Sequence, residues 1–281
     1  MNVLNRVLRY LSIWLRPPKI ATLEFDEVDQ PALSFVSPVF VLSTGRCGTK
    51  WLTELLRRDP RMRVNHSDYP ELIRHSRLAY EQYAEMPRVF QEIIRAARDG
   101  YNLDAYRRGQ VYVETNNRIT FFAYAVQAVY PQARFIHLIR HPGDFVRSGL
   151  RRGWYHGGRH DVGRIRNIVD PAGWEEMTDT ARIAYLWNET NQYIETFAKT
   201  LDVGALMQVR AEDMFSGVQA TKAIADFVGA KIQDRIIRSM LKKKINRQMT
   251  GNILPYREWS RESKMQLQKY ASLAERYGYE I

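Results

Sequence analysis

Residues 40–52 read Phe40-Val41-Leu42-Ser43-Thr44-Gly45-Arg46-Cys47-Gly48-Thr49-Lys50-Trp51-Leu52, an apolar run that leads through a glycine-containing turn into an amphipathic helix. A strand, a tight turn and a helix N-terminus together favour anions, because the first helical N–H groups have no intrahelical partner and the helix dipole attracts negative charge. Glycine lets the backbone approach such an anion closely. Arg46 and Lys50 add cations, and Thr49 adds a hydroxyl. The stretch therefore predicts a phosphate-binding turn.

This turn differs from two better-known phosphate loops. The loop that binds nucleoside triphosphates has the pattern G-x-x-x-x-G-K-[ST], whereas here two residues separate Gly45 from Gly48, and Thr49 precedes Lys50. Phosphatases with a catalytic cysteine need arginine at the sixth position after it, where this chain has threonine. We therefore expect Cys47 to fill space in the loop and not to act as a nucleophile.

Composition describes a globular protein with an anionic partner. The chain has 281 residues, of which 45% are hydrophobic and 26% charged, which suits one large α/β domain. A formal charge of +11 favours a phosphorylated nucleotide, a nucleic acid, an acidic or sulfated substrate, or a membrane surface. The single cysteine excludes an intramolecular disulfide and a cysteine-rich zinc site, so we expect a reducing compartment such as the cytoplasm.

Residues 1–20 form a separate segment with leucines at helical spacing. Its only charges are positive, and it is too short and too interrupted by arginine to span a bilayer. Two interpretations stay open: a basic amphipathic helix that touches a membrane surface peripherally, or a terminal helix packed on the domain. Residues 21–281 are expected to form a single domain.

Strands and helices alternate along this domain. Helical patterns separate five buried strand candidates, which indicates a parallel sheet covered on both faces, hence a three-layer α/β/α fold. Residues 152–173 have many glycines and arginines and weak periodicity, so we expect a long loop or lid. The strand candidates are residues 34–42, 61–65, 110–114, 134–139 and 205–210.

A second anion site is expected at another strand end. Because ligands of open α/β sheets bind at the carboxyl ends of the strands, Arg46, Glu114, Arg140 and Arg210 should share one rim. Ser148 follows Arg140 by about two helical turns. An arginine and a hydroxyl from one strand–helix junction suit a second phosphate group.

The two motifs together resemble the sulfotransferases that use 3′-phosphoadenosine 5′-phosphosulfate (PAPS). Residues 43–51 resemble the 5′-phosphosulfate loop of that family, with Arg46 at a place often held by lysine. Arg140-His141-Pro142-Gly143-Asp144, followed by Ser148, resembles its 3′-phosphate motif. Residues 209–213 and the tail from Trp259 add weaker similarities, so that the resemblance covers roughly residues 34–280.

The resemblance implies a fold related to P-loop nucleotide kinases and the transfer of a sulfuryl group from PAPS to a hydroxyl or amine, with 3′-phosphoadenosine 5′-phosphate (PAP) as product and no metal. Arg46 would stabilise charge on the leaving group, with Lys50 as a second candidate. Arg140 and Ser148 would bind the 3′-phosphate. The implied ligands of the 5′ end are Thr44, Gly45, Arg46, Cys47, Gly48, Thr49, Lys50 and Trp51.

A general base is needed to take the proton of the acceptor. Many bacterial relatives have H-E-P-x-P-E-L after the second strand, and here the glutamate after His66 is replaced by serine. His66 is our first choice for the base, Asp68 and Glu71 are alternatives, and Glu114 is a supporting residue or a further contender.

The acceptor is not specified by any motif. The arginine-rich residues 152–173 suggest an extended or acidic acceptor such as a saccharide or a lipid headgroup. A nucleotide-dependent kinase is the alternative enzyme, but the triphosphate loop is missing. A nucleic-acid-binding protein would explain the charge, yet there is no stripe of basic and aromatic residues, so we expect no nucleic-acid partner.

Overall fold

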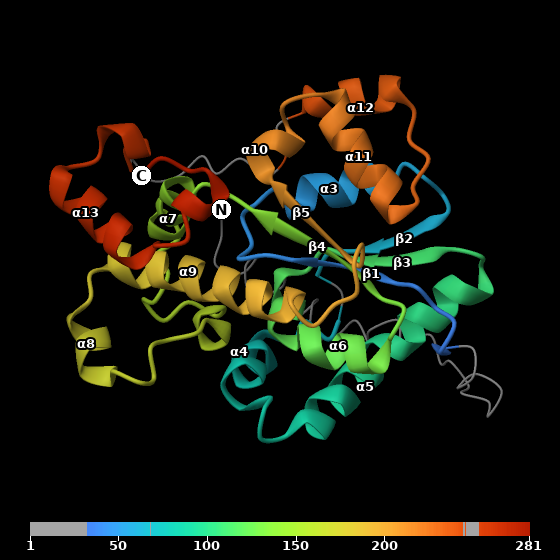
Figure 1. Cartoon of the computed structure of the whole chain (residues 1–281), viewed down its shortest axis with the longest axis horizontal. Coiled ribbons are helices and arrows are strands. Elements are labelled where there is room, and N and C mark those ends of the chain that lie inside the picture. Colours follow the sequence, from blue (N-terminus) through green and yellow to red (C-terminus); the bar gives the residue numbers. More distant parts are fainter. Residues whose placement is uncertain (1–32, 68, 244, 246–252) are drawn as a thin grey trace, which may run out of the picture.

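One five-stranded parallel sheet lies at the centre of the chain, whose computed structural model describes residues 33–67, 69–243, 245 and 253–281 (Figure 1). The strand order is β2-β3-β1-β4-β5, and every pairing is parallel, which confirms the predicted sheet. The predicted helix within residues 1–20 lies outside the described residues. The strands are β1 (Val39–Leu42), β2 (Met62–Asn65), β3 (Val111–Glu114), β4 (Arg134–Ile139) and β5 (Leu206–Arg210).

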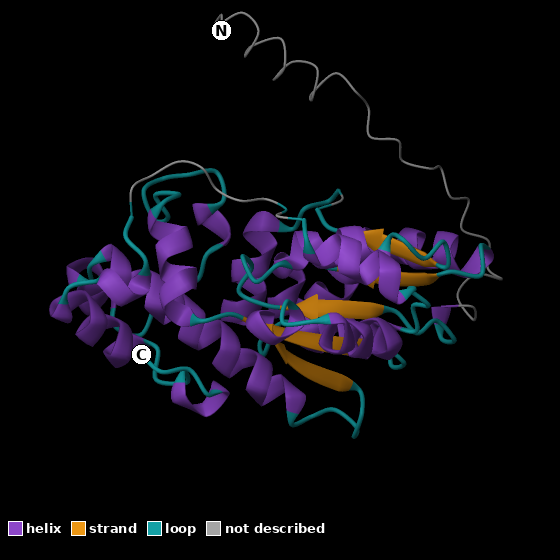
Figure 2. Ribbon diagram, turned by 90° about the horizontal axis from the view of Figure 1, so that it is seen from above, coloured by secondary structure: helices purple, strands orange, loops and turns teal. Residues whose placement is uncertain are grey.

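Helices cover both faces of this sheet, and the views along two directions show the three layers (Figures 1 and 2). Those on one face are α3 (Thr49–Leu56), α10 (Ala211–Met214), α11 (Val218–Val228) and α12 (Asp234–Leu241). The helices on the opposite face are α4 (Ile73–Gln82), α5 (Pro87–Arg107), α6 (Ala123–Val129), α7 (Pro142–Leu150), α9 (Asp179–Ala198) and α13 (Arg261–Tyr270). The short helix α8 (Pro171–Glu176) precedes α9. The 3₁₀ helices are η1 (Asn117–Phe122), η2 (Asp161–Gly163), η3 (Tyr256–Glu258) and η4 (Glu275–Tyr277).

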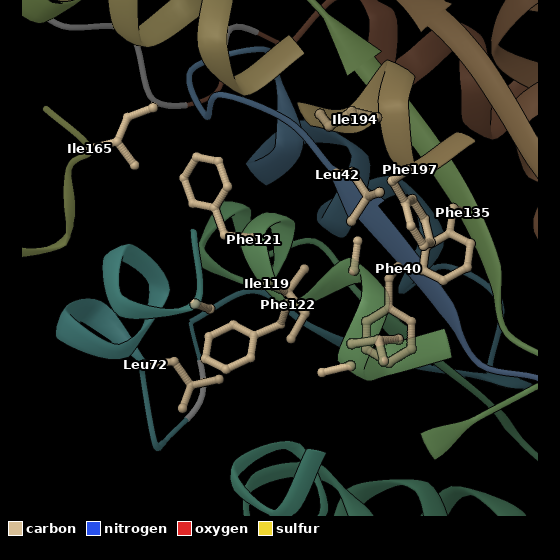
Figure 3. Packing of buried hydrophobic residues seen from close by; sticks show 14 of the residues in the cluster. Phe40, Leu42, Leu72, Ile119, Phe121, Phe122, Phe135, Ile165, Ile194 and Phe197 are labelled. Atoms are coloured by element: carbon tan, nitrogen blue, oxygen red, sulfur yellow. The ribbon is translucent and has the colours of Figure 1, made fainter. Parts of the chain in front are cut away.

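Strand alternation divides the interior into two hydrophobic cores. Val39 and Val41 of β1 point to one face, and Phe40 and Leu42 point to the other, as side chains of a strand must. Around Phe40 the second core is rich in aromatic rings, whose packing Figure 3 shows. Because apolar side chains dominate both cores, strands of four to six residues suffice to hold the sheet.

Local features set the ends of several helices. Thr178 separates α8 from α9, and its hydroxyl caps the N-terminus of α9 by accepting from the Ala181 amide. Gly217, which has an extended backbone, lies between α10 and α11. The long helix α5 continues without a break to Arg107. Tertiary packing on β3 outweighs local propensity there.

A buried ion pair fastens α5 to the sheet. Arg98 donates from Nε and Nη2 to the two carboxylate oxygens of Glu114, at 2.5 and 2.8 Å. The Tyr112 hydroxyl donates to the same carboxylate at 2.9 Å. Arg98 and Glu114 are 1% and 2% exposed, so each charge depends on the other for compensation.

None of the described helices is long and apolar enough to cross a bilayer.

We predict that Arg98→Met lowers the free energy of unfolding by about 3–5 kcal/mol, because it leaves the Glu114 carboxylate buried and unpaired. Urea denaturation followed by circular dichroism measures this change. The control is Arg108→Met, whose partner Asp104 sits on the surface, and it should cost less than about 1 kcal/mol. If Arg98→Met does not fold, the double variant with Glu114→Leu should; equal losses in the Arg98 and Arg108 variants would contradict the assignment.

Candidate active site

The turn between β1 and α3 has the backbone of an anion-binding loop. Gly45, Arg46 and Gly48 all have positive φ angles, of 77°, 60° and 92°. Gly48 caps α3 without any side-chain hydrogen bond. Within the described part of the chain, the amides of Cys47 and Thr49 donate to no backbone carbonyl oxygen. These N–H groups can therefore donate hydrogen bonds to a bound anion.

Glycine is required at both ends of this turn. A Cβ atom on Gly45 would lie 3.0 Å from the side chain of Asn117, and one on Gly48 would lie 2.9 Å from Met214 and Phe215. The left-handed backbone adds strain for any other residue at these positions. All residues from Ser43 through Trp51 line one cavity.

Cys47 fills the interior of the turn, as expected. Its thiol donates to the Gly45 carbonyl oxygen at 3.1 Å and contacts the Thr44 hydroxyl at 3.3 Å. Burial raises the pKa of the Cys47 thiol to about 11. The thiol is therefore protonated at neutral pH and is a poor nucleophile.

The two predicted phosphate motifs are in direct contact. Arg46 Nε donates to Ser148 Oγ at 3.2 Å, and Arg140 Nη1 donates to the Arg46 carbonyl oxygen at 2.8 Å. Trp187 Nε1 in turn donates to the Arg140 carbonyl oxygen at 2.9 Å. The turn after β1 and the β4–α7 junction thus form one site, although about a hundred residues separate them in sequence.

Arg152 belongs to this site and was not predicted. Its Nη1 lies 2.7 Å from Ser148 Oγ. Burial, together with the charges of Arg46 and Arg140, lowers the pKa of Arg152 to about 10. The pKa of Arg46 is lowered by burial and by Arg140 as well. Such shifts identify guanidinium groups that repel one another and that an anion would stabilise.

The cavity around these residues has a volume of about 1150 Å³ and is strongly basic. Among the described residues that line it, nine carry a positive charge and two carry a carboxylate. The cations are Arg46, Lys50, Arg118, Arg140, Arg147, Arg151, Arg152, Arg164 and Lys243, and the carboxylates are Asp144 and Glu212.

His66 lies at the end of β2 and lines the same cavity. Its Nδ1 is 2.9 Å from the Thr115 hydroxyl oxygen, and that hydroxyl donates to the Asn65 carbonyl oxygen at 3.2 Å. Because the Thr115 hydroxyl proton is donated to the Asn65 carbonyl oxygen, His66 Nδ1–H donates to the Thr115 oxygen, and His66 Nε2 keeps its lone pair. Burial, and then the charges of Lys50 and Arg57, lower the pKa of His66. The imidazole is therefore neutral at pH 7 and able to accept a proton.

The other candidate bases lie elsewhere or have partners. Glu71 pairs with Arg159 at 3.4 Å and does not line the cavity. Glu114 is bound on both oxygens by Arg98 beneath the sheet edge, which matches the supporting role and not that of a base. Asp68 lies outside the described residues. Of the four predicted carboxyl and imidazole candidates, His66 is the one that the described structure brings to the cavity.

The side chain of Trp51 is held by contacts outside the loop. Its indole Nε1 donates to the Met240 carbonyl oxygen at 2.9 Å, and its ring packs edge-on against Phe215 at 5.0 Å. Lys50, by contrast, is exposed at the cavity wall.

Arg210 was predicted on the anion-binding rim, but its role is structural. It pairs with Asp213 at 2.8 and 2.9 Å, and it donates to the Tyr277 carbonyl oxygen at 3.3 Å. Glu212 accepts from the Tyr279 hydroxyl at 2.7 Å. This segment therefore ties the C-terminal tail to the end of β5.

The segment of residues 152–173 reaches the cavity. Arg164 stacks over Trp154, with its guanidinium carbon 4.3 Å from the ring centre. His160 Nδ1 lies 2.8 Å from Nη2 of Arg118, a residue that was not predicted. Arg118 follows β3 by only a few residues, so the rule about carboxyl ends of strands could have found it. Over the ranges that the structure describes, no three His, Cys, Asp or Glu side chains gather as a metal site would need.

Comparisons with known proteins agree with this geometry. A model described as "Sulfotransferase family" matches residues 38–234. A search of curated proteins found no match.

Solved structures share the fold. A sulfotransferase domain from the curacin biosynthetic pathway covers 88% of this chain and 99% of its own length, with 14% identity and a TM-score of 0.52. The sulfotransferase domain of the Synechococcus PCC 7002 olefin synthase covers 88% and 97%, with 16% identity and a TM-score of 0.52. Sulfotransferase STF9 from Mycobacterium avium covers 91% and 80%, with 13% identity and a TM-score of 0.54. The predicted fold is thereby confirmed, and because the family match extends over more than half of its residues, the chain belongs to the sulfotransferase family.

Proposed function

We propose that this sulfotransferase uses PAPS as its donor and transfers the sulfuryl group to a hydroxyl or amine of a saccharide or lipid headgroup, leaving PAP. The observation that supports this donor is the contact of the turn after β1 with Arg140 and Ser148, which places two anion-binding motifs side by side. A nucleotide phosphorylated at both ends of its ribose would satisfy both motifs. The cavity fits such a ligand, since amides and mutually repelling guanidiniums at the turn need negative charge.

In this proposal each motif holds one end of the donor. The amides from Cys47 to Trp51 hold the 5′ end, and Arg140 with Ser148 holds the 3′-phosphate. The Ser148 oxygen already accepts from Arg46 and Arg152, so its own hydroxyl proton is available to a phosphate oxygen.

When bound, PAPS supplies the activated sulfuryl group. Arg46 places positive charge where the leaving phosphate gains negative charge, and its guanidinium is oriented by the Ser148 hydroxyl. Lys50 adds a mobile cation on the same wall. His66 Nε2 takes the proton of the acceptor, while the hydrogen bond at Nδ1 holds the ring in place.

We predict that the protein binds PAP more tightly than adenosine 5′-phosphate, ATP or a DNA duplex in calorimetric titrations. Arg140→Gln should weaken PAP binding by about 10- to 100-fold, because a charge-assisted hydrogen bond is lost. Binding of adenosine 5′-phosphate, which lacks the 3′-phosphate, should hardly change. Arg108→Gln on the surface is the control for general charge. Tight ATP binding without PAP binding would contradict the proposed donor.

Replacing Arg46 tests its role in transfer. Arg46→Asn keeps a side chain that tolerates the left-handed backbone at this position, and it should lower kcat by about 100-fold or more. Arg46→Lys, which restores the charge, should recover much of the rate. Activity is followed as transfer of radioactive sulfate from PAPS, with circular dichroism as the check of folding. An Arg46→Asn enzyme of normal kcat would remove this residue from the mechanism.

The base should leave a signature in the pH profile. Since a base must be neutral and the pKa of His66 is lowered, kcat/KM should be constant near pH 7 and fall only below pH 6.5. Arg57→Gln removes a repelling charge, so the pKa of His66 should rise and the acidic limb should move to higher pH. His66→Gln should lower kcat/KM by about 100-fold or more, and the acidic limb of the pH profile should disappear. An acidic limb that persists in His66→Gln would assign the base to another residue.

A further inference from the structure

The cavity carries more positive charge than the proposed donor can neutralise. Nine cations and two carboxylates line it, whereas PAPS has roughly four negative charges, counting about two for the terminal phosphate. Charges that stay uncompensated in a half-buried site are costly, so a second anion is expected next to the donor.

Arg118 lines the same cavity as His66, the proposed base. It follows β3 at the start of η1, where the Asn116 side chain accepts from its amide at 3.2 Å and the Ser76 hydroxyl donates to its carbonyl oxygen at 2.9 Å. The charge of Arg118 lowers the pKa of His66. An acceptor that presents its hydroxyl to His66 would therefore lie within the electrostatic influence of Arg118.

The guanidinium of Arg118 is oriented without an ion pair. Nη2 lies 2.8 Å from His160 Nδ1, and burial and the charge of Arg118 lower the pKa of His160, which keeps this imidazole neutral. No carboxylate among residues 33–67, 69–243, 245 and 253–281 forms an ion pair with Arg118. Asp161 pairs with Arg164, and Glu71 pairs with Arg159. The charge of Glu71 raises the pKa of Arg118, but burial has the larger effect and lowers that pKa.

We propose that the acceptor carries an anionic group, such as a carboxylate, phosphate or sulfate, which Arg118 binds so that the acceptor hydroxyl faces His66. The inference rests on the proposed function, because it takes the donor to occupy the turn after β1 and the Arg140 site. His160 acts as a positioning residue that holds the guanidinium toward the cavity.

Two isosteric probes test the charge of the acceptor. 4-Hydroxybenzoate and 4-hydroxybenzamide share ring and hydroxyl and differ by one charge. With PAP saturating, calorimetry should give a dissociation constant about tenfold lower for the carboxylate with the wild-type protein. In Arg118→Gln, which can still donate to His160, the preference should vanish, and Arg118→Lys should restore part of it. Arg166→Gln, which replaces an exposed arginine of residues 152–173 that does not line the cavity, should keep the full preference.

The results of these titrations distinguish a wrong donor from a wrong acceptor. If PAP itself does not bind, the proposed donor is wrong. If PAP binds but the two probes bind equally, or neither binds at millimolar concentration, the anionic acceptor is wrong. If Arg118→Gln still prefers 4-hydroxybenzoate to 4-hydroxybenzamide, Arg118 is not the residue that binds the anionic group.

Discussion

Arg140 donates a hydrogen bond to the carbonyl oxygen of Arg46, and this contact joins the two motifs that line the cavity. Several other arginines of the cavity are oriented by neutral acceptors: Arg46 by a hydroxyl, Arg147 by the Ile253 carbonyl oxygen, and Arg118 by an imidazole. A neutral acceptor orients a guanidinium without cancelling its charge, so this positive charge persists after folding and is directed at the cavity.

Arginines of the scaffold have a different kind of partner. Arg98 binds Glu114, Arg61 binds Asp59, and Arg210 binds Asp213. Arg98 holds α5 on β3, while Asp59 also accepts from the Lys231 amide and Arg210 also donates to the Tyr277 carbonyl oxygen. Two cavity arginines have carboxylate partners as well: Arg140 pairs with Asp144 and Arg164 with Asp161. The contacts of each arginine and its place in the fold, and not the formal charge of +11, distinguish the cavity arginines from the structural ones.

Local patterns in the sequence predicted the sheet and the part of the cavity that residues 43–51, Arg140 and Ser148 form. All five strands were located within a few residues of their ends, except that β1 begins at Val39 and not at residue 34. Residues 43–51, Arg140 and Ser148 meet as expected, because strand ends of a parallel sheet share one edge. Arg152 was missed, since its place beside Ser148 depends on a contact within the fold that has no periodic signal. Arg118 was missed although it follows β3 by only a few residues. Arg210 could not be distinguished from a ligand of the site, because Asp213 neutralises it only through the folded turn.

The elements that we propose to bind the donor belong to both hydrophobic cores. Cys47 and Trp51 pack into the core beside α3 and α11, whereas Phe145 and Val146 of α7, the helix that carries Ser148, pack into the other. A molecule held between the turn after β1 and α7 would connect two halves that the sheet otherwise keeps apart. Its binding free energy would then be lost whichever half opened first, so that occupancy would make the unfolding of the two cores a single cooperative event.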